Sequence, residues 1–466
     1  MQKAIKNELH LDLASNIFIP EKSLYQNILI TGTTGSGKTS SAMYPFCKQL
    51  INYESLNSDK KLGMLILDVK GNFYEQTLKF ARESYRENDV VLINLSGKEK
   101  YNPLDKPNLK ASVLADRLKT ILLLFSPNNT DDYWLDKAAQ VLTEAIKLCR
   151  LINNNYVTFT EIHKIIFVPD YFSSKINSIK KDFQNAKFND EHCFEILSCI
   201  DFFENEFKNL DERVASIVKS EISRITSMFV SDYNVKNTFC PSKETITFSG
   251  FKSCLEQGKI VVLCMNLAEH QNLARFIAAY LKLDFQSEVL RLLSNSSFIR
   301  PSVFLCDEFH EFVTRTDADF FAQSREAKCI NIVATQSYSS LVKTLKDTTC
   351  MRVLTQNLIN KLWFRTDDSF TIEEIQKQLG KEDKERKSHT ISENAKETKY
   401  HYLTNRFHSN GSNLSESFNT YTQHDFIYDT NFFTRELGTF ECLAFLSDGE
   451  KILEPNKLKM KPYFQD

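Results

Sequence analysis

The chain has 466 residues, of which 42% are hydrophobic and 25% are charged, an ordinary composition for a soluble globular protein with room for two domains. The net charge of −2 excludes the overall basic surface that captures nucleic acid by charge alone, although a basic lining inside a pore would not appear in that sum. The longest apolar runs, such as ILLLF and IVVLCM, are far shorter than the ~18 residues that span a bilayer.

The N-terminal segment MQKAIKNELHLDLASN lacks the apolar core of a secretory signal. Eleven scattered cysteines without a paired framework are typical of reduced thiols. We therefore expect a cytoplasmic protein with no transmembrane segment of its own.

Short apolar runs bounded by turn residues predict buried strands, because a run that is apolar on both faces suits a parallel sheet. These runs are residues 27–31, 64–69, 90–95, 259–266, 302–308 and 330–336. Helical patterns follow several of them, and residues 271–293 carry apolar side chains at three- and four-residue intervals. The alternation predicts an α/β fold with a parallel-type central sheet.

The pattern changes between residues 105 and 234, where strand-like runs nearly vanish and helical spacing occupies 113–125, 133–152 and 213–230. We expect an all-helical domain at 105–234, inserted into a discontinuous α/β domain of residues 1–104 and 235–466. Residues 381–420 are polar and predict a mobile loop, with disorder as the alternative. Residues 441–452 predict a closing strand and turn.

A glycine-rich segment, GTTGSGKT at 32–39, follows the first predicted strand and precedes a helix. Its glycines allow backbone N–H groups to turn toward phosphate, and the helix N-terminus adds positive potential. This pattern predicts an ATP site in which Lys38 reaches the β and γ phosphates and the Thr39 hydroxyl binds Mg²⁺. Pro45 predicts a kink or an early end of the helix. The alternative is a flexible glycine turn. The predicted nucleotide-binding residues are Gly32, Thr33, Thr34, Gly35, Ser36, Gly37, Lys38, Thr39 and Ser40.

An acidic pair, Asp307 and Glu308, ends a buried apolar run. Asp307 suits the Mg²⁺ shell, and Glu308 suits activation of the attacking water. A Glu directly after the Asp favours a hydrolase over a kinase, because a kinase must avoid activating water. The alternative for the pair alone is a solvated turn.

Two further residues are candidates for catalysis. Gln336 ends the next predicted strand, where it can sense the γ-phosphate, and its alternative role is a strand-end cap. Arg325 is expected on a helix, from which it can complete a neighbour's site as an arginine finger. The alternative for Arg325 is an ordinary surface charge.

Together with these motifs, further segments in the same order resemble the type IV coupling proteins of conjugation and secretion, the TraG/TraD-like branch of the hexameric FtsK/HerA motor ATPases. They are LILDVKGNFYE (65–75), KYNPLD (100–105), DDYWLDKAAQVLTEAI (131–146), FLCDEFHEF, SREAKCINIVATQS (324–337) and LTQNLINKLWFRTDD (354–368). The resemblance covers residues 17 to 452. Asp68 and Lys70 match a family segment whose role the sequence does not give.

The resemblance implies a RecA-like P-loop ATPase that uses ATP and Mg²⁺ and assembles as a homo-hexamer. It implies delivery of single- or double-stranded DNA, with relaxase-type protein cargo, to a membrane-anchored secretion channel. Members of the family typically carry N-terminal membrane anchors, so recruitment to the inner face of the cell membrane by a partner is expected here. The alternatives are a cytosolic DNA translocase without a channel and an ATP-regulated recruitment module for protein cargo.

Overall fold

The computed structural model describes residues 8–14, 16–126, 132–185, 190–295, 300–394, 398–409 and 413–465. The chain forms two compact units. The first contains the residues up to Thr366 together with those from Gly438 onward, and the second is Asp367–Leu437.

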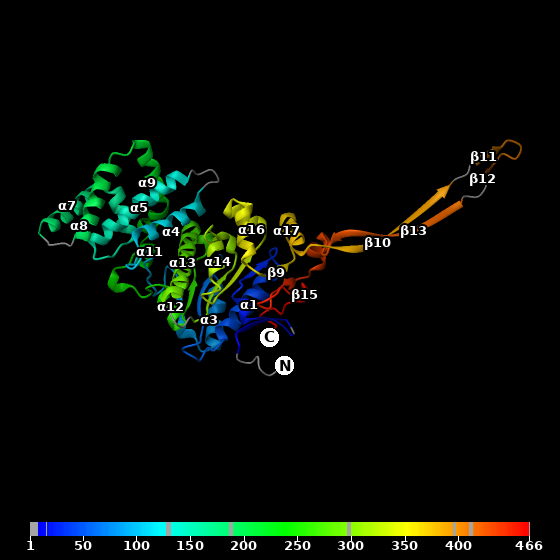
Figure 1. Cartoon of the computed structure of the whole chain (residues 1–466), viewed down its shortest axis with the longest axis horizontal. Helices are drawn as coiled ribbons and strands as arrows, with labels where there is room; N and C mark the ends of the chain where they lie inside the picture. The colour runs from blue at the N-terminus through cyan, green and yellow to red at the C-terminus, as the bar shows by residue number, and fades with distance from the viewer. Residues whose placement is uncertain are drawn as a thin grey trace. The chain divides into compact units, whose positions relative to one another are not determined.

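A nine-stranded sheet forms the centre of the first unit (Figure 1). Its order is β15 (Asn456–Lys459), β14 (Glu441–Phe445), β9 (Asn360–Phe364), β3 (Ile28–Thr31), β8 (Cys329–Thr335), β7 (Ser302–Cys306), β4 (Gly63–Leu67), β6 (Ile260–Leu263) and β5 (Val90–Ile93). The strands from β9 to β5 are parallel, and β14 is antiparallel to both β9 and β15. All strands predicted from apolar runs are present, so the expected α/β fold with a largely parallel sheet is confirmed.

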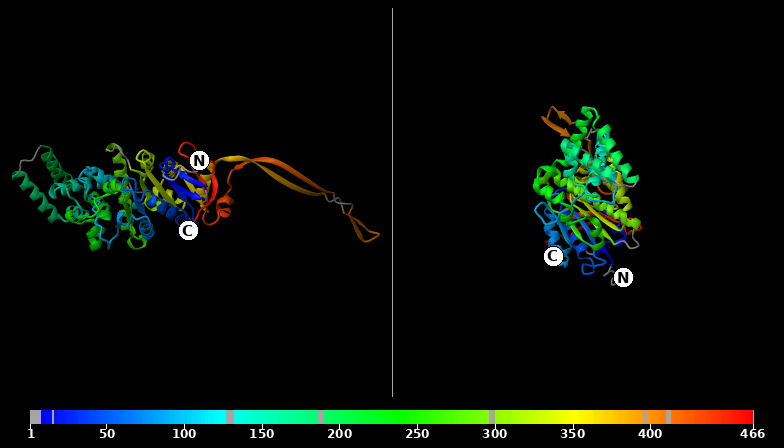
Figure 2. Two further views of the ribbon diagram at one scale, coloured as in Figure 1. Left: turned by 90° about the horizontal axis from the view of Figure 1, so that it is seen from below. Right: turned by 90° about the vertical axis from the view of Figure 1, so that its left-hand side faces the viewer.

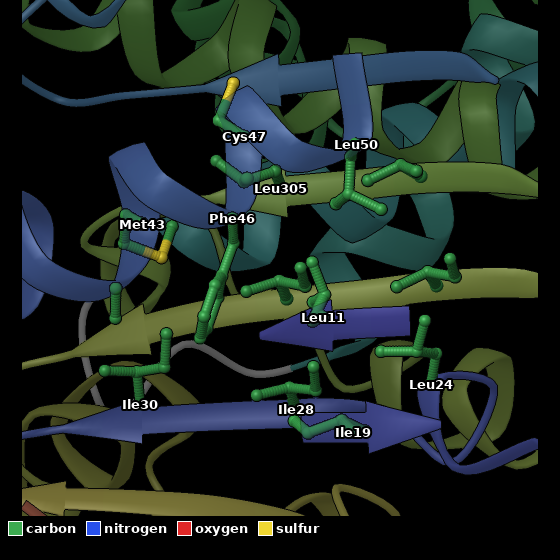
Figure 3. Packing of buried hydrophobic residues seen from close by; sticks show 14 of the residues in the cluster. Leu11, Ile19, Leu24, Ile28, Ile30, Met43, Phe46, Cys47, Leu50 and Leu305 are labelled. Atoms are coloured by element: carbon green, nitrogen blue, oxygen red, sulfur yellow. The ribbon is translucent and has the colours of Figure 1, made fainter. Parts of the chain in front are cut away.

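Both faces of this sheet are buried. On β3, Ile28 and Ile30 face one layer, in which side chains of α2 (Tyr44–Asn52) such as Phe46 and Leu50 pack against the strands (Figure 3). On β7, Phe304 faces the opposite layer, where its ring lies 6.2 Å from Phe285 of α13 (Leu267–Asn295). Burial on both faces explains why these strands read as unbroken apolar runs rather than as alternating patterns.

The remaining elements of the first unit surround the sheet. A hairpin of β1 (His10–Ala14) and β2 (Ile17–Pro20) is followed by α1 (Glu21–Leu24). The other helices near the sheet are α3 (Phe73–Glu83), α12 (Phe251–Gln257), α14 (Asp317–Gln323), α15 (Tyr338–Leu345) and α16 (Thr348–Gln356), with short turns at Glu87–Asp89, Lys243–Thr245 and Phe309–Glu311.

Between β5 and β6 the described residues contain helices and no strand. Besides the turn Lys243–Thr245 and α12, they are α4 (Ala111–Phe125), α5 (Asp132–Ile152), α6 (Phe159–Phe167), α7 (Pro169–Asn185), α8 (Asp190–Asp201), the turn Phe202–Phe207, α9 (Glu212–Thr226), α10 (Met228–Ser231) and α11 (Tyr233–Phe239). The boundaries 105–234 for a separate inserted domain stay a prediction.

A buried ion cluster ties this helical stretch to α13. Lys106 Nζ lies 2.8 Å from Asp284 Oδ2, and Arg117 Nη1 lies 3.0 Å from Asp284 Oδ1. The Tyr101 hydroxyl also donates to Asp284 Oδ2 at 2.8 Å. Burial opposes ionisation of Asp284, but the two cations outweigh it and hold the pKa of this carboxyl below its usual range.

The second unit contradicts the expectation of a mobile loop at 381–420. Its main feature is a two-stranded antiparallel ribbon of β10 (Lys381–Asn394) and β13 (Asn413–Phe426), which lie side by side in Figures 1 and 2. A second pair, β11 (Thr398–His401) and β12 (Arg406–Ser409), lies between them in the chain, and α17 (Ser369–Leu379) and the turn Phe432–Glu436 flank the ribbon.

Polar composition misleads here because a two-stranded ribbon has no buried face that demands apolar residues. Its cross-strand pairs stabilise it instead. Arg386 Nη2 lies 2.7 Å from Asp425 Oδ2 on the other strand. The rings of His389 and Phe418 stack with their centroids 4.3 Å apart.

Strand β9 is missed by the apolar pattern because Asn360 and Lys361 interrupt it. Lys361 is only 4% exposed, and burial lowers its pKa from 10.5 to about 8. Its ammonium lies 5.8 Å from the centre of the Phe445 ring. A charged lysine at this position costs stability at neutral pH.

We predict that Lys361→Met raises the free energy of unfolding at pH 7 by up to about 3 kcal/mol, because each pKa unit corresponds to about 1.4 kcal/mol. The unfolded chain holds this proton up to pH about 10.5 and the folded chain only up to about 8, so wild-type stability should rise between those values. The variant should lack that rise. Urea unfolding at several pH values measures both effects. Lys252→Met, at a side chain that is 72% exposed, is the matched control, and an equal gain there would contradict the prediction.

Candidate functional site

The glycine-rich loop joins β3 to a π-helical turn, Thr39–Met43, that continues into α2. Gly35 and Gly37 have positive φ angles of 79° and 100°, which favour glycine. Lys38 is buried and donates to the Gly32 and Thr33 carbonyl oxygens at 2.5 and 3.2 Å. Pro45 lies in the first turn of α2, which continues to Asn52, so the helix does not end early at this proline.

Thr39 and Asp307 are brought together from distant parts of the chain. Asp307 follows β7, and its Oδ2 accepts a hydrogen bond of 2.8 Å from Thr39 Oγ1. Burial, followed by the charges of Glu308 and Asp68, raises the pKa of Asp307 to about 6. A carboxylate and a hydroxyl oxygen are hard ligands, and a divalent cation would relieve the crowding of acidic groups, so the residues fit Mg²⁺.

Glu308 adopts a left-handed backbone conformation, with φ of 49°. Its buried Oε2 has no hydrogen-bond partner among the described residues. Strained backbone and an unsatisfied buried carboxylate oxygen are features that concentrate at functional sites. The geometry therefore leaves this carboxylate able to accept a proton from a substrate.

His310 belongs to the site, although the sequence reasoning does not select it. Its Nδ1 lies 3.6 Å from Glu308 Oε2 and 3.2 Å from Thr335 Oγ1, and burial lowers the pKa of the ring. Its Nε2 lies 3.7 Å from Glu311 Oε1. The sequence signal that could have identified His310 is its position two residues after the acidic pair.

Asp68 follows β4 at the same edge of the sheet and holds the turn into α3. Its carboxylate accepts from the backbone N–H groups of Lys70, Asn72 and Phe73 at 3.1–3.2 Å. Gly71 has a φ of 67°, and a Cβ there would lie 2.8 Å from the Asn266 nitrogen. Asp68 thus has a structural role, and Lys70 is exposed.

Gln336 directly follows β8 and lines a cavity of about 830 Å³ together with Arg275, His310 and Lys343. It therefore lies at the edge that carries Asp307. Arg325 does not lie on a helix as expected, because α14 ends at Gln323 and Arg325 occupies the exposed turn before β8. That turn is at the amino edge of the parallel strands, opposite Asp307.

Two family models match the chain. The type IV secretion-system coupling protein DNA-binding domain matches residues 13–171, and the TraM recognition site of TraD and TraG matches residues 301–424. The chain belongs to the type IV coupling protein family. The resemblance carried by its motifs is thereby confirmed, and both models include residues of the candidate site.

Solved structures of another coupling protein share the fold. The bacterial conjugative coupling protein TrwBdeltaN70, in an unbound form, is 14% identical with a TM-score of 0.63, covering 99% of this chain and 89% of that chain. Plasmid coupling protein TrwB in complex with ADP and Mg²⁺ is 13% identical with a TM-score of 0.61, covering 99% and 91%. A comparison with curated proteins gives no match. Within the described ranges of the present chain, no helix combines the length and apolar content needed to cross a bilayer.

We predict that Gly37→Ala destabilises the protein more than Gly35→Ala. Both substitutions place a side chain at positive φ, at a cost of about 1 kcal/mol or more. Only at Gly37 would the new Cβ overlap a neighbour, the Phe440 ring, which adds about 1–3 kcal/mol. Urea unfolding measures the difference. Combining Gly37→Ala with Phe440→Ala should be less than additive, and full additivity would argue against the overlap.

Proposed function

We propose that this chain is a coupling ATPase that uses ATP hydrolysis to deliver or translocate DNA, with bound relaxase-type protein, to a type IV secretion channel. The observation that carries the proposal is the convergence of the phosphate loop with Asp307 and Glu308 in a chain of the coupling protein family. TrwB, which shares the fold, has been solved with ADP and Mg²⁺ and with non-hydrolysable ATP and GTP analogues, and this supports ATP and Mg²⁺ as the cofactors.

In this proposal, backbone N–H groups of residues 32–40 and the Lys38 ammonium bind the phosphates. Thr39 and Asp307 would hold Mg²⁺, which would supply charge neutralisation at the phosphates. Glu308 orients the attacking water and accepts its proton. His310 lies beside the Glu308 carboxylate, with its Nδ1 3.6 Å from Oε2, and Gln336 senses the terminal phosphate from the end of β8.

We propose that the chain assembles as a homo-hexamer in which Arg325 acts across the interface between subunits. Its position at the amino edge of the sheet separates it from the Asp307 site of its own chain. In a ring, we propose that Arg325 completes the site of a neighbouring subunit as an arginine finger. The ring works in the cytoplasm and is recruited by a membrane-anchored channel partner to the inner face of the membrane.

The test is steady-state ATP hydrolysis with and without single-stranded DNA. Wild type should hydrolyse ATP faster with DNA, and Lys38→Ala should lose hydrolysis because phosphate binding is weakened. Hydrolysis indifferent to DNA would favour protein cargo or an ATP-regulated recruitment role. No hydrolysis by wild type, with or without DNA, would contradict an autonomous motor.

We predict that Glu308→Gln lowers kcat at least about 100-fold while Mg²⁺–ATP binding is retained, because a general base contributes about 10²- to 10⁴-fold. Glu311→Gln is the matched control. Glu311 also contacts His310 but pairs with Arg275, so its loss should leave kcat within a few-fold. Equal losses in the two variants would remove the specific role of Glu308.

A further inference from the structure

Three aromatic side chains gather beside the phosphate loop. Phe440 precedes β14, and Tyr463 and Phe464 follow β15 near the end of the chain. The Phe464 ring is 6.2 Å from that of Phe440 and 5.4 Å from that of Tyr463, with interplanar angles of 71° and 79°. Phe464 is 59% exposed, which is high for a phenylalanine held between two other rings.

Backbone hydrogen bonds attach this cluster to the loop at two points. The Phe440 nitrogen donates to the Ser36 oxygen at 3.0 Å, and the Tyr463 nitrogen donates to the Ser40 oxygen at 2.9 Å. The Phe440 ring also packs on Gly37, where no Cβ would fit. The rings therefore hold a fixed position relative to the phosphate-binding backbone.

The orientation of a bound triphosphate follows from the carboxylates. Its terminal phosphate must face Asp307 and Glu308, because hydrolysis takes place there. The nucleoside is at the other end of the triphosphate and leaves the loop on the side away from these acids. The aromatic cluster contacts the loop at Gly37 and Ser40, the residues that flank Lys38 and Thr39.

We propose that Phe440 and Phe464 form the nucleobase site of this chain, with the exposed Phe464 ring stacking on the base and Phe440 supporting it edge-on. This inference rests on the proposed nucleotide-binding function of the same loop. Tyr463 is held from behind by Tyr44, whose ring centre is 5.0 Å away, so it fixes the position of Phe464. The rings of Phe440 and Phe464 carry no hydrogen-bonding group, so they recognise the face of a base and not its edge.

Two consequences distinguish this site from a structural cluster. Stacking of one base on an aromatic ring contributes enough free energy that removing the ring lowers the affinity for a nucleotide about tenfold to hundredfold. That contribution applies to a nucleotide and not to its phosphate chain alone. In addition, ATP and GTP should bind with similar affinity, because the phenylalanine rings offer no donor or acceptor that separates the two purines.

The experiment measures binding of ATP, GTP and inorganic tripolyphosphate by displacement of a fluorescent ATP analogue, on the full chain. For Phe464→Ala we expect ATP and GTP to bind about tenfold to hundredfold more weakly, with tripolyphosphate unchanged. Phe464→Trp should restore ATP binding because it restores the stacking surface. Tyr85→Ala, at a tyrosine that is 85% exposed, is the control for loss of a surface ring and should bind all three ligands as wild type does.

Tripolyphosphate binding also reports whether the loop of each variant is folded. Equal weakening of ATP and tripolyphosphate in Phe464→Ala would overturn the proposal in favour of a purely structural role, and unchanged ATP binding would overturn it as well. If the wild-type protein binds ATP through Phe464 but does not hydrolyse it with or without DNA, the proposed motor function is wrong and the proposed base site is still supported.

Discussion

The parallel pairing of β3, β8, β7 and β4 is the constraint on which the candidate site depends. Thr31 pairs with Thr335, and Cys306 pairs with Val333, so the strands end at one edge of the sheet. The phosphate loop, the acidic pair, Gln336 and the Asp68 turn each begin where one of these strands ends. A shift in any pairing would separate groups that are hundreds of residues apart in sequence.

The site is electrostatically costly before it binds anything. Asp307, Glu308 and Asp68 bring like charges together, and burial adds to their repulsion at Asp307. Lys38 offsets only part of this, because burial lowers its own pKa. The fold tolerates the cost through buried apolar layers on both faces of the sheet, which is the usual relation between a functional site and its scaffold.

The sequence predicts the parts of the fold in which local pattern and burial agree. Strands such as β3 and β7 are apolar on both faces, and the phosphate loop and Asp307 have distinctive residue types at fixed places. Strand β9 is missed because Lys361 is buried at an energetic cost that no local pattern reveals. The ribbon is missed because Arg386 and Asp425 pair across strands that are distant in sequence. His310 and the Phe440–Phe464 contact are missed for the same reason, since tertiary packing alone creates them.

The ribbon has a consequence for how such chains can vary in length. Its register runs without a shift from Lys381 opposite Phe426 to Asn394 opposite Asn413. Inserting two residues into each strand would lengthen it while every side chain kept its face, whereas a single-residue insertion in one strand would reverse the faces beyond that point or force a bulge. Because the ribbon has no buried face, natural length variation in this segment should be equal in the two strands, so that the cross-strand register is kept.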